Sequence, residues 1–444
     1  MSELSLPREV NYGAPMPALP DGAVSTLMSV QSTNGISFSS GQVIQFDLPS
    51  QAGLYIIPSS VFIRYRYTIT NTATATAPVV VRKPAYTLIT RLEEFIGSQP
   101  VSSVYAYNLA ANSFIDQNFS LADVVGQYAG FGFSANPTDY TDLDGQSGNG
   151  SGTNGGVYTG YVAAPLVCSA LAGMSHYYPT SLTAPWRIQL TVAPLSEVVS
   201  VVANVSSIAI VQPELCFQVI QLGSAVDAMV TQMAPTLKIK TRAWAVASQS
   251  IASGTSGFQT LPFNHRYESL SSIFLHSCST STTKSLNAQW GDSFNPMGTA
   301  GTNGSVQFQI GQAMYPQLPL NNATGGVTAV LQYLRQCNSG SITDQRNTMA
   351  IQLPNWTQYS GDATASTTNA PAKFVVGIPL EKVVPASPYA LTSLLSGVSA
   401  TQSPINVLLN IGSSLNTQFN FFLVAEYDEI IEIMPAMKQV NIVC

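Results

Sequence analysis

Short runs in which apolar and polar residues alternate are the clearest pattern along the chain, and they are typical of half-buried β-strands. In Val61–Tyr67 (VFIRYRY), arginines alternate with aromatic and aliphatic residues. Gly41–Pro49 and Gly53–Thr70 hold further apolar runs of strand length. Ala110–Tyr128 has apolar residues at spacings compatible with one or two short helices. The pattern therefore predicts a mainly β protein with few helical segments.

The apolar runs occur twice along the chain, in the same order. A glutamate lies between two strand-like segments at Glu214 and again at Glu426, about 212 residues later. Stretches without any Asp, Glu, Lys or Arg recur at equivalent places, over 145–186 and 383–425. Three further motifs also occur twice: Ser-Ser-(Val/Ile)-Phe at 59–62 and 271–274, Ile-Gly at 96–97 and 310–311, and Pro-Leu at 165–166 and 379–380. Each Pro-Leu pair is followed by a strand-like segment that begins with proline, at 185–192 and 404–411. Four matches in one order indicate a tandem duplication.

The duplication predicts two copies of one β-domain of about 200 residues. Each copy has room for some eight strands, and eight antiparallel strands in two sheets form a jelly roll. The predicted fold is all-β: two tandem eight-stranded antiparallel jelly rolls with short helical excursions in loops. We expect an extended N-terminal arm over 1–35, a first jelly roll over 36–225, a linker over 226–242 and a second jelly roll over 243–444. The linker includes the basic residues Lys238, Lys240 and Arg242, which interrupt a sequence that is otherwise poor in charged residues.

Composition narrows the class of protein further. Charged residues make up only 9% of the chain, against about 25% in an average soluble protein. Hydrophobic residues make up 45%, which argues against disorder. The net charge is −6, and Arg8 is the only basic residue among the first forty. No basic footprint for nucleic acid is present, so we expect no direct sequence-specific nucleic-acid binding.

Cysteines and the N-terminal sequence bear on the compartment. The five cysteines have no CxxC spacing, so we expect small buried side chains in a reducing compartment rather than a disulfide framework. The first residues contain several prolines and no apolar core, so they do not read as a signal peptide. No apolar run reaches the ~20 residues of a membrane span. We expect synthesis in the cytosol and no secretion through a signal peptide.

Each candidate for catalysis or metal binding has a simpler structural explanation. Packed histidines are favoured over a nucleophilic or metal site, and solvent faces, loops or subunit contacts over paired catalytic carboxylates. The G-x-G-x-x-G match at Gly150–Gly155 lacks a strand–turn–helix context. We therefore predict no catalytic, cofactor-binding or metal residues and no cofactor. The candidates weighed are His176, His265 and His276, and the carboxylates Glu93, Glu94, Asp139, Asp142, Asp144, Asp428 and Glu429.

The repeated segments also carry a family resemblance. Val162–Leu166 (VAAPL), Val376–Leu380 (VGIPL) and the Ser-Ser-(Val/Ile)-Phe strand openings resemble double jelly-roll major capsid proteins. These proteins belong to a lineage of adenoviruses, tailless membrane-containing phages, virophages and large DNA viruses. The resemblance covers roughly residues 30–440 and implies a structural protein, not an enzyme. It implies homotrimers that form pseudo-hexagonal capsomers and tile an icosahedral virus shell.

The same resemblance implies partners and a location. The partners are neighbouring capsomers, vertex (penton) proteins, minor capsid proteins and, in membrane-containing members, an underlying membrane. The location is the virion capsid, after synthesis in the host cell cytosol.

Three other interpretations stay open on the residues alone. A single-jelly-roll capsid protein with a protruding domain, from a small RNA or single-stranded DNA virus, conflicts with the duplication and the missing basic arm. A secreted carbohydrate-binding β-sandwich protein predicts a signal sequence. A β-sandwich glycosidase predicts a cleft lined by convergent carboxylates, which so few charges disfavour.

Overall fold

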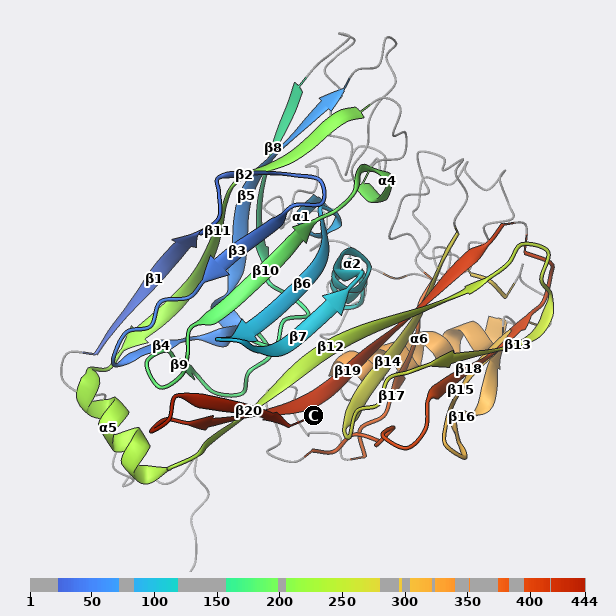
Figure 1. The fold of residues 1–444 in the computed structure, drawn as a ribbon. Coiled ribbons are helices and arrows are strands. Elements are labelled where there is room, and N and C mark those ends of the chain that lie inside the picture. Colours follow the sequence, from blue (N-terminus) through green and yellow to red (C-terminus); the bar gives the residue numbers. More distant parts are fainter. Residues whose placement is uncertain are drawn as a thin grey trace, which may run out of the picture.

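The computed structural model describes residues 23–71, 84–118, 157–198, 205–279, 295–297, 304–321, 324–339, 351, 374–382, 395–415 and 417–443. Within these residues the chain forms mainly antiparallel strands, which assemble into four sheets (Figure 1). Two sheets come from the first half of the sequence and two from the second half.

The first half forms a seven-stranded sheet and a four-stranded sheet, named here the first large sheet and the first small sheet. β11 is the centre of the large sheet, with β5 on one side and β1 on the other. The large sheet contains β8 (Val157–Pro165), β5 (Phe62–Asn71), β11 (Val205–Gln221), β4 (Leu54–Ile56), β9 (Tyr178–Pro179), β1 (Val24–Gln31) and β2 (Ser37–Ser39). The small sheet contains β3 (Val43–Asp47), β10 (Trp186–Val192), β6 (Ile89–Ile96) and β7 (Gln99–Tyr105).

The second half forms a five-stranded and a four-stranded sheet, named the second large sheet and the second small sheet. β19 is the centre of the large sheet, between β14 and β12. The large sheet contains β12 (Leu237–Ile251), β19 (Phe419–Met434), β14 (Leu270–Ser279), β17 (Val376–Pro379) and β20 (Gln439–Val443). The small sheet contains β13 (Gly257–Phe263), β18 (Ile405–Ile411), β15 (Ser305–Ile310) and β16 (Ala313–Asn321).

The two halves share one strand order. In the large sheets β8-β5-β11-β1 corresponds to β17-β14-β19-β12, and in the small sheets β3-β10-β6-β7 corresponds to β13-β18-β15-β16. Two antiparallel four-strand sets packed face to face make a jelly roll. The prediction of two tandem eight-stranded jelly rolls is therefore confirmed, with extra short strands added to each large sheet.

The sequence matches that revealed the duplication differ slightly in register. Glu214 lies opposite Arg64, whereas Glu426 lies opposite Ser272. Pro165 lies opposite Phe62, yet its counterpart Pro379 also lies opposite Ser272. In the first half the glutamate and the proline lie opposite residues two positions apart, and in the second half they lie opposite the same residue. The relative register of the two motifs therefore differs by two residues between the halves. Because side chains in a strand alternate with a period of two, this shift leaves every residue on the same face of its sheet.

Burial along the strands follows from what covers each face. β10 and β18 bury every second residue, as expected for strands with one face on the core. β19 instead is buried at every position from Phe421 to Glu429. Both faces of the second large sheet are therefore covered, one of them by an element from outside its own pair of sheets.

Helices lie in the connections. α2 (Tyr107–Asn118) follows β7, and α6 (Thr324–Ser339) follows β16, so the helix predicted after this strand exists in both halves. Shorter helical segments are η2 (Pro58–Ser60), α1 (Pro84–Thr87) and α4 (Leu195–Val198). None of the helices in the described residues is both long and apolar enough to cross a membrane.

α5 (Ser224–Met233) connects the two jelly rolls and is fixed by one buried carboxylate. Asp227 accepts hydrogen bonds from the Gly53 amide and the Tyr55 hydroxyl, each at 2.8 Å, and from the Ser181 hydroxyl. Burial, followed by the Asp227 carboxylate, raises the pKa of Tyr55. The linker helix is thereby held against the first jelly roll.

The sheets take in residues that the sequence assigned to the arm and the linker. β1 lies inside the predicted arm of 1–35, and β12 begins inside the predicted linker of 226–242. Met28 and Val30 of β1 pack against the core, which explains why this uncharged segment forms a strand. The domain boundaries themselves stay a prediction.

Candidate functional site at the junction of the two jelly rolls

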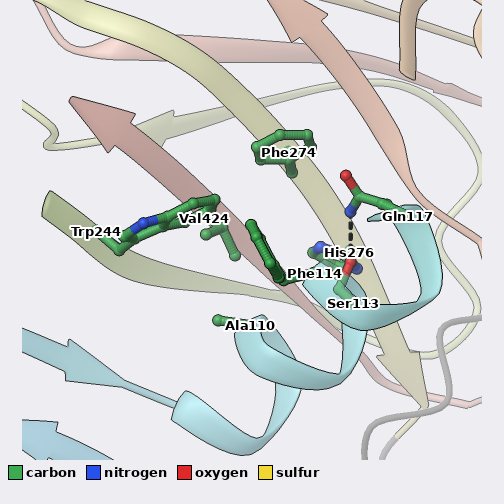
Figure 2. A pocket seen from close by; sticks show the side chains of 8 residues that line it. All are labelled: Ala110, Ser113, Phe114, Gln117, Trp244, Phe274, His276 and Val424. Carbon is green, nitrogen blue, oxygen red and sulfur yellow. Dashed lines mark hydrogen bonds between the residues drawn. The ribbon is translucent and has the colours of Figure 1, made fainter. Parts of the chain in front are cut away.

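Helix α2 of the first jelly roll covers the outward face of the second large sheet, the face turned away from its small sheet. Phe114 of α2 meets Trp244 of β12 edge to face, with ring centroids 5.6 Å apart. Trp244 in turn stacks on Phe274 of β14 at 6.1 Å. Figure 2 shows Phe114 reaching from the helix toward the sheet. Aromatic contacts of this kind stabilise beyond the area they bury.

A small cavity remains between the helix and the sheet, lined in part by His276 (Figure 2). His276 is only 2% exposed, and burial lowers the pKa of its imidazole to about 3, with Asp116 opposing the shift. The imidazole is therefore neutral at pH 7. The cavity holds about 10 Å³, which is room for about one water molecule. This volume excludes a substrate.

A loop over Leu166–Ser175 forms the second contact of the junction, and Glu94 of β6 shapes it. The Glu94 carboxylate, 0% exposed, accepts hydrogen bonds from the Ser169 hydroxyl at 2.7 Å and from the amides of Ala170 at 2.6 Å and Leu171 at 3.2 Å. Burial raises the pKa of Glu94, and these donors oppose the shift. Glu94 thus fixes the loop in one conformation.

The shaped loop caps the outer edge of β12. The Ser175 amide donates to the Lys240 carbonyl at 2.9 Å, and the Arg242 amide donates to the Gly173 carbonyl at 3.4 Å. The Thr241 hydroxyl also donates to the Ala170 carbonyl. Unpaired strand edges are prone to pair with other chains. This loop satisfies part of the β12 edge within the same chain.

Charged groups on β12, on β19 and just after β17 form ion pairs at the junction. Arg242 pairs with Glu381 at 2.7 Å and with Glu426 at 3.2 Å, and Lys240 pairs with Asp428 at 3.1 Å. Burial raises the pKa of Glu426 and of Glu381, while Arg242 opposes both shifts. Two cations therefore face three carboxylates. In the described part of the chain, no group of three or more His, Cys, Asp or Glu is arranged to hold a metal ion.

Gly173 gives a direct test of the loop contact. A Cβ atom at this position would lie 2.7 Å from the Arg242 carbonyl oxygen, so the loop must move away from β12. We expect Gly173→Ala to lower the free energy of unfolding by about 1–3 kcal/mol, measured by urea denaturation. Tyr177→Ala, at an exposed position just beyond the loop, is the control and should change it by less than about 0.5 kcal/mol. Equal effects of the two variants would contradict the close approach.

The three candidate histidines differ in burial and in their hydrogen-bond partners. His265 is buried, with its Nε2 atom 2.9 Å from the Leu423 carbonyl, and burial lowers its pKa. His276 is packed under α2, as described. His176 is exposed beside the Ser175 hydroxyl. His265 and His276 are both packed in the interior, whereas the expectation that His176 is packed is wrong, because its side chain is exposed.

The carboxylate candidates fall into three groups. Glu93 lies near the surface and pairs with Arg91 at 2.8 Å. Glu94, Asp428 and Glu429 are buried, as is Glu426, so their interpretation as solvent-facing residues is wrong. They face the junction or the sheet interior, where hydrogen bonds and cations compensate for burial. Asp139, Asp142, Asp144 and Gly150–Gly155 lie outside the described residues.

The described cysteines behave as small apolar residues. Cys168, Cys216 and Cys278 are buried, Cys337 is half-buried, and all four are free thiols. Burial raises the pKa of Cys168, so this thiol stays protonated. The prediction of buried cysteines is therefore confirmed for three of them, and Cys444 lies outside the described residues.

Comparison with solved structures identifies the architecture. The Faustovirus major capsid protein matches with a TM-score of 0.59 and 10% identity, over 95% of this chain and 92% of that chain. A chain of the Sputnik virophage matches with a TM-score of 0.56 and 12% identity, over 100% and 92%. The mavirus major capsid protein matches with a TM-score of 0.53 and 10% identity, over 100% and 95%.

The chain has the double jelly-roll fold of viral major capsid proteins. The similarity spans nearly the whole length of each protein, so it includes both jelly rolls. The fold expected from the sequence resemblance is confirmed, and a single jelly roll with a protruding domain is excluded as the fold. No protein-family model matches the sequence, and no curated protein matches it either.

Sequence reasoning missed the residues that build the junction. Glu94, Gly173 and Trp244 lie in three separate segments and meet only in the folded chain. One signal was present: Glu94 is a carboxylate in a strand whose alternation places it with apolar residues, which indicates a buried role.

Proposed function

We propose that the protein is a major capsid protein, a structural subunit without enzymatic activity, whose homotrimers form pseudo-hexagonal capsomers that tile an icosahedral virus shell. The single observation that supports this most is the double jelly-roll fold over nearly the full chain. Six jelly rolls from three copies supply the six sides that such a capsomer needs. The structures that match are themselves viral capsid proteins.

The low charge of the chain supports a tiling role. Subunits that pack side by side bury large areas, and a charged side chain costs free energy when it is desolvated without a partner. Because only 9% of the residues are charged, few side chains would add this desolvation cost to the contact between subunits. We propose neighbouring capsomers, vertex proteins and minor capsid proteins as partners, the virion capsid as the location and an underlying membrane as a further contact.

The mass and shape of the purified protein test this proposal. Light scattering should give about three times the 47.1 kDa of one chain, and negative-stain microscopy should show roughly hexagonal particles or closed shells. The measurement should be repeated over a range of protein concentrations, since assembly follows mass action. A compact monomer at every concentration would contradict the proposal and favour the alternative of a carbohydrate-binding β-sandwich protein.

A further inference from the structure

A lysine and an aspartate form an ion pair in the interior of the junction. The Lys240 Nζ atom of β12 lies 3.1 Å from the Asp428 Oδ1 atom of β19, and the two side chains are 10% and 0% exposed. Oδ1 accepts no hydrogen bond from the residues that the structure describes. Desolvation offsets much of the attraction within a pair buried this deeply. Burial therefore gives the pair little net stabilisation, but it brings an amino group and a carboxyl group into contact away from water.

The Asp428 carboxyl group is polarised at its other oxygen. The Oδ2 atom accepts a hydrogen bond from the Ser269 hydroxyl at 2.9 Å, and the Asp428 amide donates to the Ser269 carbonyl at 2.9 Å. The Gly397 amide donates to the Ser269 Oγ atom at 3.0 Å, which orients the hydroxyl proton toward Asp428. A fixed donor of this kind stabilises the negative charge that develops on a carboxyl oxygen when a nucleophile adds to the carbon.

Glu381, just after β17, is placed to carry protons at this site. It interacts electrostatically with Lys240 and with Asp428, and it pairs with Arg242 at 2.7 Å. Burial raises the pKa of Glu381, while Arg242 opposes the shift. A carboxyl group whose pKa is raised toward the working pH transfers protons more effectively as a general acid and base.

The loop over Leu166–Ser175 covers the strand that carries the lysine. The Ser175 amide donates to the Lys240 carbonyl at 2.9 Å, and the Thr241 hydroxyl donates to the Ala170 carbonyl. Two groups held in contact react as if they were present at very high concentration. Exclusion of water from such a site disfavours the reverse reaction, which is hydrolysis.

We propose that Lys240 and Asp428 condense to an amide bond that crosslinks β12 to β19 within one chain. A proton first passes from the Lys240 ammonium to Oδ1, which leaves a neutral amine beside a carboxylic acid. The amine lone pair adds to Cγ, and the carbonyl electron pair moves onto Oδ2, where the Ser269 hydroxyl stabilises it. Glu381 takes one proton from the nitrogen and returns it to Oδ1, the Cγ–Oδ1 bond breaks, and one water molecule leaves. Nothing is oxidised or reduced, and one cation and one anion disappear together.

The crosslink encloses most of the second jelly roll, because it joins positions 240 and 428. A covalent link across so long a segment restricts the unfolded chain, so the crosslinked subunit should resist denaturant better than the same chain without the link. The reaction is a single self-modification that needs neither a second copy nor an added reagent. It is therefore independent of the proposed capsomer.

Mass spectrometry of the full chain tests the crosslink. After incubation at pH 7, the purified protein should weigh about 18 Da less than the mass calculated for its chain, which is the mass of one water molecule. A tryptic digest should contain Lys240 and Asp428 in one branched peptide. Lys240→Arg keeps the positive charge but lacks the primary amine, so this variant should keep its full calculated mass.

Lys238 provides a matched control on the same strand. It pairs with Glu432 at 2.8 Å, also between β12 and β19, but its side chain is 65% exposed. Lys238→Arg should therefore form the crosslink at the wild-type yield, and no branched peptide should join Lys238 to Glu432.

Glu381→Gln tests the proton transfer separately. Glutamine retains a carbonyl oxygen for Arg242 but does not titrate. The crosslink should form about a hundredfold more slowly, and its rate should lose the pH dependence of the wild type. The yield of branched peptide over time, measured at several pH values, gives both results.

Three results overturn parts or all of the inference. A wild-type chain that keeps its full mass through prolonged incubation over a range of pH shows that the pair does not condense. A loss of about 18 Da that maps to a linear peptide places the dehydration elsewhere in the chain. Equal rates for Glu381→Gln and the wild type show that Glu381 does not carry the proton. None of these results depends on the number of chains in the particle, so failure of the crosslink and failure of the proposed capsomer are distinguishable.

Discussion

Replacing Glu94 with alanine is expected to lower the free energy of unfolding by about 3–5 kcal/mol. The carboxylate accepts hydrogen bonds from the Ser169 hydroxyl and from the amides of Ala170 and Leu171, and it is fully buried. Alanine leaves all three donors without an acceptor, and each buried unsatisfied donor costs about 1–3 kcal/mol. Because these donors define the loop that caps β12, the two jelly rolls should also separate more easily. Urea denaturation monitored by tryptophan fluorescence measures the change.

Glu93, next to Glu94 on β6, provides the matched control. Its side chain lies near the surface and pairs with Arg91, and exposed ion pairs contribute at most about 1 kcal/mol. Glu93→Ala should therefore change the free energy of unfolding by less than about 1 kcal/mol under the same conditions. A Glu94→Ala effect no larger than that of Glu93→Ala would show that the loop does not depend on this carboxylate.

The pH dependence gives a second test of the same group. Burial holds the pKa of Glu94 above its ordinary 4.5, so the folded state binds this proton more tightly than the unfolded state. Its contribution to stability is complete below pH 4.5 and declines as the pH rises through the folded pKa. Glutamine does not titrate, so the wild type should lose stability relative to Glu94→Gln as the pH rises from 4.5. A difference that stays constant with pH would contradict this assignment.

Trp244→Ala is expected to cost a similar amount, about 3–5 kcal/mol, through lost packing. Trp244 lies between Phe114 of the first jelly roll and Phe274 of the second, so its removal leaves a cavity at the junction itself. If the junction couples the two jelly rolls, the variant should also broaden the single unfolding transition or split it in two. Differential scanning calorimetry at a fixed protein concentration measures both effects.

An exposed aromatic residue in the same jelly roll serves as the control for Trp244. Phe258 on β13 is 81% exposed, and Phe258→Ala should change stability by less than about 0.5 kcal/mol. A Trp244→Ala protein that unfolds at the wild-type temperature in one sharp transition would show that the aromatic contacts do not hold the halves together.

The fold could be predicted from the sequence because alternating strands and repeated segments can be recognised along the chain without knowledge of its contacts. The alternation in β10 and β18 and the Pro-Leu segments at the ends of β8 and β17 can be read residue by residue. The pattern of β19 was less informative, because it is buried on both faces and loses its alternation. Strand β1 also escaped prediction, because Thr26 and Leu27 interrupt its alternation of apolar and polar residues.

The junction could not be predicted because it depends on contacts distant in the sequence. Glu94 and Ser169 are 75 residues apart, and Arg242 and Glu426 are 184 residues apart. Charge alone suggested that Asp428 and Glu429 face solvent, whereas Lys240 and the Ser269 hydroxyl make the burial of Asp428 tolerable. A buried carboxylate is stabilised by partners that only the folded chain brings together.

The loop that caps β12 also bears on how a new subunit survives before assembly. Because donor and acceptor belong to one polypeptide, closing this edge is a first-order folding event whose rate does not depend on subunit concentration. The intramolecular pairing has a high effective concentration, because both partners are tethered in one chain. In the part of the chain that the structure describes, the outer edge of β12 is thus paired in part before any other chain arrives, which lowers the exposure of this edge to off-pathway aggregation.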